Sequence, residues 1–261
     1  MTPTTEQKRG RLFIVLSGIF ITNALLAEMV GVKIFSAESS VGLTPAQLNI
    51  LGFEMSFNLT AGALLWPIVF LSTDLINEYF GKPGVRFISY FTAILIAYAF
   101  LAIYLTMQLA PAGFWIETNS VDNEGNPFNI QYAYNKIFGQ GLRIIVGSLA
   151  AFLLGQLVDV FVFQRLRRAT GSRMLWLRAT GSTLVSQVVD SFVVLFIAFY
   201  GTFTNAQIFA IAITNYIYKF AIALLLTPLI YLGHYWIDRY LGREEAIRIS
   251  EEASEKSQSF F

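Results

Sequence analysis

The chain has 261 residues, of which 55% are hydrophobic and only 13% are charged, about half the charged share of an ordinary soluble domain. It contains no cysteine, which excludes disulfides and thiolate metal sites, and it has a single histidine. A net charge of +1 argues against a large basic surface, so the composition predicts a membrane protein with no nucleic-acid partner.

Six segments are long and apolar enough to cross a bilayer as helices, since a hydrocarbon core of about 30 Å requires about 20 residues of helix. They are residues 11–31, 55–79, 86–110, 142–166, 179–200 and 206–235. We interpret the first as a retained helix rather than a signal peptide, because its apolar run is long and no clean cleavage site follows it. The predicted fold is an all-α integral membrane protein, with one six-helix domain at residues 1–241 and a polar cytoplasmic tail at residues 242–261.

Lysine and arginine alternate between the connections. They gather in the N-terminal arm, the turn at residues 81–86, the loop at residues 165–178 and the tail, whereas the other connections carry few. Because cytoplasmic loops retain positive charge, this pattern predicts that both termini are cytoplasmic.

Two connections are then expected on the outer side. The longer one, residues 111–141, is rich in turn residues, and we interpret it as a solvated surface loop rather than a substrate lid. In the other, Thr44 as a cap and Pro45 at the first helical position are expected to begin a short interfacial helix.

The second predicted helix ends in an acidic cluster. Asp74, Asn77 and Glu78 are spaced i, i+3 and i+4, so they share one face, and Pro67 is expected to kink the helix near its middle. Negative charge near a helix C-terminus interacts unfavourably with the helix dipole, so the helix itself does not favour carboxylates at these positions. Two explanations are open: pairing with basic residues of the cytoplasmic loops, or a substrate, gating or coupling-ion site. For Asp74 we favour the functional explanation.

The fourth and fifth predicted helices carry the same short motif. Gln156 and Asp159 in one, and Gln187 and Asp190 in the other, each place an amide and a carboxylate about one turn apart on one face. Ionisable groups at membrane depth are costly, so by default they mark a path or pocket for something polar. Hydrogen bonding between neighbouring helices is the structural alternative.

A stripe of small residues precedes the motif of the fourth helix. Gly147, Ala151 and Gly155 recur every four residues, and such a stripe lets another helix approach closely. Gln156 and Asp159 are therefore expected beside a tight helix contact and away from lipid.

The last predicted helix places Lys219 near the midplane, with Asn215 one turn earlier on the same face. From there the lysine cannot easily reach either interface, so we expect it to pair with Asp159 or Asp190. Such a pair is either a structural counter-ion arrangement or a gate.

Together these residues resemble the queuosine precursor transporter family. The resemblance is carried by the run from Thr73 to Lys82, by the two Gln-x-x-Asp motifs and by Lys219 followed by Thr227 and Pro228, and it covers about residues 11–235. It implies a multi-pass protein of the inner membrane that is not an enzyme and uses no cofactor. Its expected substrate is a 7-deazaguanine precursor of the tRNA nucleoside queuosine, such as the 7-cyano or the 7-aminomethyl base.

The chemistry of such a base agrees with the predicted site. A guanine-like edge presents an N–H and an amino group side by side, which a carboxylate accepts bidentately, and its carbonyl suits an amide or ammonium donor. We expect a motif aspartate in the first role, an amide or the lysine in the second, and aromatic residues such as Phe192 and Tyr218 on the ring faces. The expected substrate-binding residues are Gln156, Asp159, Gln187, Asp190, Asn215 and Lys219.

Two other functions are weighed against this one. A substrate-binding subunit of an ATPase-driven vitamin importer needs ATPase partners, and the first helix lacks the repeated Ala-x-x-x-Ala stripe that would dock them. An intramembrane enzyme lacks a visible base or ligand set, because there is no cysteine and we interpret His234 as part of an interfacial aromatic belt. The coupling ion is left open, as is the oligomeric state, with a homo-oligomer as one outcome.

Overall fold

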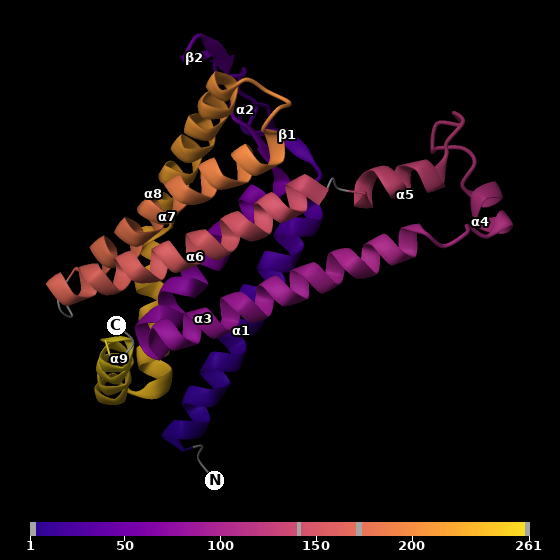
Figure 1. Cartoon of the computed structure of the whole chain (residues 1–261). Coiled ribbons are helices and arrows are strands. Elements are labelled where there is room, and N and C mark those ends of the chain that lie inside the picture. Colours follow the sequence, from indigo (N-terminus) through magenta and orange to yellow (C-terminus); the bar gives the residue numbers. More distant parts are fainter. Residues whose placement is uncertain (1–3, 140–141, 171–173, 259–261) are drawn as a thin grey trace.

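The computed structural model describes residues 4–139, 142–170 and 174–258, and most of them are helical (Figure 1). Five of the described helices are long and apolar enough to span a membrane. They are α1 (Thr5–Val30), α3 (Trp66–Met107), α6 (Leu142–Thr170), α7 (Leu175–Phe199) and α8 (Asn205–Leu241). The molecule is an all-α membrane protein, as the composition predicts.

Helix α3 takes in both the second and the third predicted helices, residues 55–79 and 86–110. It is broken at Gly81, whose backbone angles (φ 69°, ψ −172°) lie in a region that essentially only glycine adopts. Pro67 does not kink the helix at its middle; it lies in the first turn, where its missing N–H is not needed. The start predicted at residue 55 is wrong, because the residues before Trp66 form short strands and a 3₁₀ turn.

The connection between α1 and α3 is built from short elements that pair with one another. Antiparallel pairing joins β1 to β4, with Phe35 opposite Leu59, and β2 to β3, with Asn49 opposite Glu54. In chain order the elements are β1 (Ile34–Ser36), α2 (Ala37–Ser40), β2 (Leu48–Ile50), β3 (Phe53–Met55), β4 (Asn58–Thr60) and η1 (Ala61–Leu64).

The carboxylate of Glu38 organises this connection. It accepts backbone N–H groups of Phe57 at 2.8 Å and of Ala46 at 3.1 Å. Donation from Phe57, reinforced by the other hydrogen bonds, holds the pKa of Glu38 below its usual range. The helix predicted to begin at Thr44 and Pro45 does not form. Residues 43–47 have no regular structure, and the N–H of Ala46 donates to the Glu38 carboxylate instead of starting a helix.

The other long connection, residues 111–141, carries α4 (Gly113–Thr118) and α5 (Ile130–Phe138), which lie away from the helix bundle (Figure 1). None of the residues in these two helices is buried. Exposure of this kind fits the solvated surface loop that the sequence predicts; residues 140 and 141 lie outside the described part.

Helices α6 and α7 lie side by side along most of their length (Figure 1). The small-residue stripe of α6 makes this possible. A Cβ added to Gly147 would lie 3.1 Å from the carbonyl oxygen of Val194, and one added to Gly155 would lie 3.6 Å from the Cβ of Asp190. The predicted close helix contact is therefore confirmed, and α7 is the partner.

The tail beyond residue 242, predicted only as a polar cytoplasmic segment, forms helix α9 (Arg243–Gln258), and residues 259–261 lie outside the described part. Helix α9 packs against the break in α3 (Figure 1) and buries one apolar face there. The backbone N–H of Lys82 donates to Oγ of Ser257 at 2.9 Å, directly after the break. A Cβ at Gly81 would lie 2.5 Å from the carbonyl oxygen of Ala253, so α9 depends on a glycine at this position.

Candidate functional site

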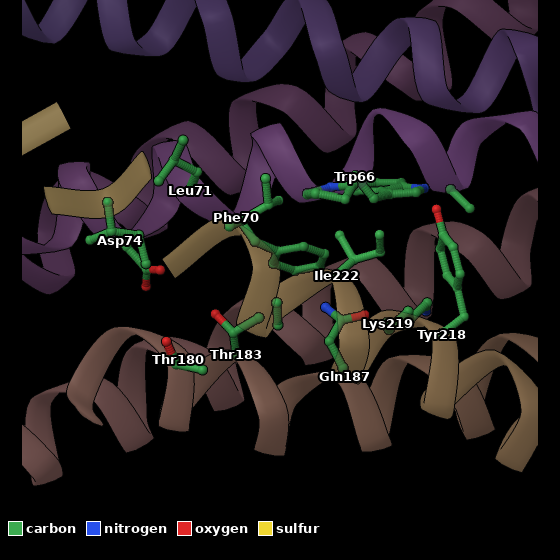
Figure 2. Close-up of a pocket in the computed structure, with 15 residues that line it drawn as sticks. Trp66, Phe70, Leu71, Asp74, Thr180, Thr183, Gln187, Tyr218, Lys219 and Ile222 are labelled. Carbon is green, nitrogen blue, oxygen red and sulfur yellow. The ribbon is translucent and has the colours of Figure 1, made fainter. Parts of the chain in front are cut away.

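A cavity lies between α3, α7 and α8, and the empty space in it, together with the part open to solvent, is about 550 Å³ (Figure 2). Each helix contributes one face to it. Residues 66, 70 and 74 of α3 follow the spacing i, i+4, i+8, and residues 180, 183 and 187 of α7 follow i, i+3, i+7.

The walls of the cavity are mainly apolar and aromatic. Trp66 and Phe70 of α3 lie with ring centroids 6.1 Å apart, and Tyr218 of α8 lines the cavity together with Ile222. Flat rings of this kind provide large contact areas for a planar ligand. Of the two aromatic residues expected at the site, Tyr218 is in the lining, whereas Phe192 packs against Phe209 instead.

Two buried polar side chains face this apolar space. Asp74 is 3% exposed and Gln187 is 2% exposed. Among the described residues, neither Oδ1 of Asp74 nor the two amide atoms of Gln187 has a hydrogen-bond partner. A buried polar atom left unpaired costs about 1–3 kcal/mol, so these atoms indicate a polar ligand. Figure 2 shows Asp74 toward one end of the cavity and Gln187 nearer the other.

Lys219 lines the end of the cavity that lies beside Tyr218 (Figure 2). Its ammonium group forms an ion pair with the carboxylate of Asp190. The sequence left Asp159 and Asp190 open as partners, and the structure selects Asp190. Since Asp190 is committed to Lys219 and does not line the cavity, it presents no free carboxylate to a ligand there.

The other copy of the motif lies behind the cavity, on α6. Gln156 and Asp159 are almost completely buried, and neither lines the cavity. Oε1 of Gln156 accepts a hydrogen bond from Thr73 at 3.2 Å, and Oδ1 of Asp159 accepts one from Ser186 at 3.2 Å. The two copies of the motif therefore occupy different surroundings. Asn215 is half-buried on α8 and is also outside the lining.

The residues of the acidic cluster lie just before the break in α3, at the end of its first arm (residues 66–80), and they have different surroundings. Asp74 faces the cavity, whereas Glu78 pairs with Arg178 at 2.8 Å and Arg167 at 3.5 Å. Glu78 thus follows the pairing explanation. Asn77 accepts a hydrogen bond from the side chain of Gln164 at 2.7 Å and, like Glu78, is not in the lining.

The single histidine takes part in a hydrogen-bond network between two helices. His234 is half-buried, and its Nδ1 lies 2.9 Å from the hydroxyl of Tyr79. The same hydroxyl donates to Asp238 at 2.8 Å. This network joins α3 to α8 close to the break in α3, and the interfacial position of His234 stays a prediction.

Sequence reasoning missed several lining residues: Trp66, Phe70, Thr180 and Thr183. A signal was present, since Trp66 and Phe70 lie two turns and one turn before Asp74 on the same face of α3. The two threonines likewise precede Gln187 at helical spacing. The spacing of residues within one helix does not predict which other helix that face will pack against.

Comparison with known proteins places these helices in one family. A family model described as "Putative vitamin uptake transporter" matches residues 60–233. The chain is similar to the probable queuosine precursor transporter of Bacillus subtilis (strain 168), with 34% identity over 190 residues, covering 71% of this chain and 77% of the relative. It is similar to the queuosine precursor transporter of Escherichia coli (strain K12), with 35% identity over 189 residues and coverages of 71% and 75%. No solved structure matches the chain.

Proposed function

The chain belongs to the queuosine precursor transporter family, and from this membership we propose that it imports a 7-deazaguanine precursor of queuosine across the inner membrane. It is a multi-pass membrane protein, and its cavity has the aromatic walls that a planar base needs. The substrate is the 7-cyano base, the 7-aminomethyl base or both. We propose transport rather than catalysis, in line with the names of the relatives.

The observation that carries the proposal is the pair of unpartnered polar side chains between aromatic walls. A 7-deazaguanine presents an N–H and an amino group side by side, and the carboxylate of Asp74 accepts both. The amide of Gln187 donates to the carbonyl of the base. Trp66 and Phe70 cover a face of the ring.

This assignment changes the role that the sequence gave to the motif aspartates. We propose Asp74 as the base-binding carboxylate because, among the carboxylates that the structure describes, it alone combines an uncommitted buried oxygen with a place in the lining. Lys219 stays in the proposed site, held in position by Asp190 at the end of the cavity. Gln156 then acts by holding α6 to α3 through Thr73. Asn215 and Asn77 receive no contact with the base.

We also propose that the two arms of α3 cross the membrane separately. At about 1.5 Å per residue, its 42 residues extend about 63 Å, twice the thickness of a hydrocarbon core of about 30 Å. The break at Gly81 supplies the reversal, and basic Lys82 and Arg86 follow it. The proposed topology has six crossings with both termini cytoplasmic, because α9 packs on the side where the break and these basic residues lie.

Uptake of labelled 7-cyano-7-deazaguanine, by cells that neither make nor otherwise import it, tests the proposed site. Replacing Asp74→Asn is expected to lower uptake at limiting substrate by about 10- to 100-fold, since a hydrogen bond to a charged group contributes about 1.5–3 kcal/mol. Gln187→Ala is expected to lower it by about 2- to 10-fold, since a hydrogen bond between neutral groups contributes about 0.5–1.5 kcal/mol. Gln156→Ala is the matched control, because it removes the same side chain from the equivalent motif position outside the lining. Undiminished uptake in both cavity variants, at equal protein levels, would refute the assignment.

A second measurement tests the chemical basis of recognition. An analogue that lacks the exocyclic amino group offers Asp74 only one N–H, so it is expected to compete at least about tenfold less well with the wild type. In Asp74→Asn the two compounds should compete about equally. If the variant keeps the full preference for the amino group, Asp74 does not contact that edge of the base.

A further inference from the structure

Asp159 is the most deeply buried carboxylate of the described residues, with no exposed surface. Its Oδ1 accepts the hydroxyl of Ser186, and its Oδ2 is buried without a hydrogen-bond partner among the described residues. It takes part in no ion pair within the described part of the chain. Because it is also outside the cavity lining, the substrate does not reach it.

The surroundings of Asp159 are polar but neutral, apart from one carboxylate. From α7, the hydroxyls of Ser182, Thr183 and Ser186 face it. From α3, Asp74 is its electrostatic neighbour, and the hydrogen bond from the adjacent Thr73 to Gln156 fixes that helix beside α6.

The nearest described cations are already engaged. Arg178 and Arg167 are both paired with Glu78, one helical turn beyond Asp74. They hold the end of the first arm of α3, and neither forms an ion pair with Asp159 or Asp74.

The duplicated motif supplies an internal comparison. Asp190 has the same residue type at the same motif position, but its charge is neutralised by Lys219. Asp159 has no such partner, and a lone ionised carboxylate away from water is very costly. The chemistry that removes this cost without a second side chain is the binding of a proton at the unpartnered Oδ2.

We propose that Asp159 binds the proton that is carried with the substrate, and that Asp74 links the two binding events. The inference rests on the base-binding role of Asp74 proposed above. To accept the N–H edge of the base, Asp74 must be ionised, and a negative charge on neighbouring Asp159 opposes that ionisation. A proton on Asp159 removes the opposition, so proton and base each favour the binding of the other. Transport is then proton-coupled uptake in one direction.

Wild-type protein provides the first test and needs no variant. At a pH where both Asp74 and Asp159 of the free protein are ionised, binding of 7-cyano-7-deazaguanine to purified protein in weakly buffered detergent solution is expected to take up one proton, seen with a pH indicator; at a pH where the pair already holds one proton, that proton moves from Asp74 to Asp159 and no net uptake is expected. By linkage, affinity falls by up to about tenfold per pH unit over the range in which that proton is lost from the free protein. Binding without proton uptake at every pH would overturn the inference and would leave the proposed function intact.

Liposomes that contain Asp159→Asn provide the second test. The amide is a neutral mimic of the protonated acid, so this variant is expected to bind the base and to exchange labelled for unlabelled base, but not to accumulate it in response to a proton gradient. Asp159→Asn liposomes that still accumulate base with a proton gradient would refute the assignment, and so would wild-type accumulation that follows a sodium gradient instead. If Asp74→Asn binds the base as tightly as the wild type, the base-binding site itself is wrong, a separate outcome.

Discussion

Replacing Gly81 by alanine tests whether α9 clamps the break in α3. The backbone there lies in a glycine-only region, which costs another residue about 1–3 kcal/mol. The new Cβ would lie 2.5 Å from the carbonyl oxygen of Ala253 and 2.6 Å from Oγ of Ser257, so α9 must move away. Its movement breaks the hydrogen bond from Lys82, worth about 1 kcal/mol. The expected loss is therefore about 2–4 kcal/mol before any loss of apolar burial.

Thermal unfolding of the purified protein, followed by tryptophan fluorescence, measures this loss. At about 2–4 °C per kcal/mol, Gly81→Ala is expected to lower Tm by about 4–16 °C and to open α9 to proteases. Gly201→Ala is the matched control, because Gly201 also has a positive φ (80°) but has nothing within 4 Å of the added Cβ. If Gly81→Ala lowers Tm no more than the control and α9 stays protected, the clamp does not exist.

Three further predictions concern charged groups. Arg178→Ala is expected to destabilise the protein by about 3–5 kcal/mol because it leaves the buried Glu78 short of a cation, and adding Glu78→Gln should recover most of the loss; equal melting of the single and double variants would contradict this. Lys219→Met is expected to lower Tm and uptake, with partial recovery when Asp190→Asn is added, and a double variant worse than the single one would exclude the pairing. Since the pKa of Glu38 is held below its usual 4.5 by backbone amides, its stabilisation of the outer connection is full above about pH 4.5 and is lost as pH falls through the lowered value. The amides of Phe57 and Ala46 should therefore lose protection against hydrogen exchange as pH falls in the wild type, after correction for the intrinsic exchange rate, whereas Glu38→Gln should show no such pH-dependent loss. The same pH profile in both proteins would disprove this role of Glu38.

The membrane-spanning elements were predictable because the bilayer sets their length. Apolar runs of about 20 residues located α1, α6, α7 and α8, and the structure extends them by a few residues at most ends. The start of α3 was not predictable in this way. Residues 53–55 pair with residues 48–50 in a tight hairpin, and residues 58–60 pair with residues 34–36. The second pairing is not local, so the apolar pattern around these residues does not disclose it.

The site was predictable in its residue types and only partly in its geometry. Burial cost identified Asp74, Asp159, Asp190 and Lys219 from the sequence alone. The two motif aspartates have the same local spacing, so nothing near them in the chain says which one meets Lys219. That choice is made by the way α8 packs on α7, and the same packing forms the two walls of the cavity that face α3.

The position of α9 in the chain also sets when it can dock during folding. Helix α9 follows α3 and α6 in the chain, so a ribosome releases it after the two helices to which Ser250 connects it. Until Ser250 reaches Arg167 and Glu78, this polar cluster lacks its last hydrogen-bonding side chain and stays open to water. Docking of α9 is therefore a late step of folding. A protein fused to the C-terminus that blocks this docking would lower the yield of folded protein before it affected transport.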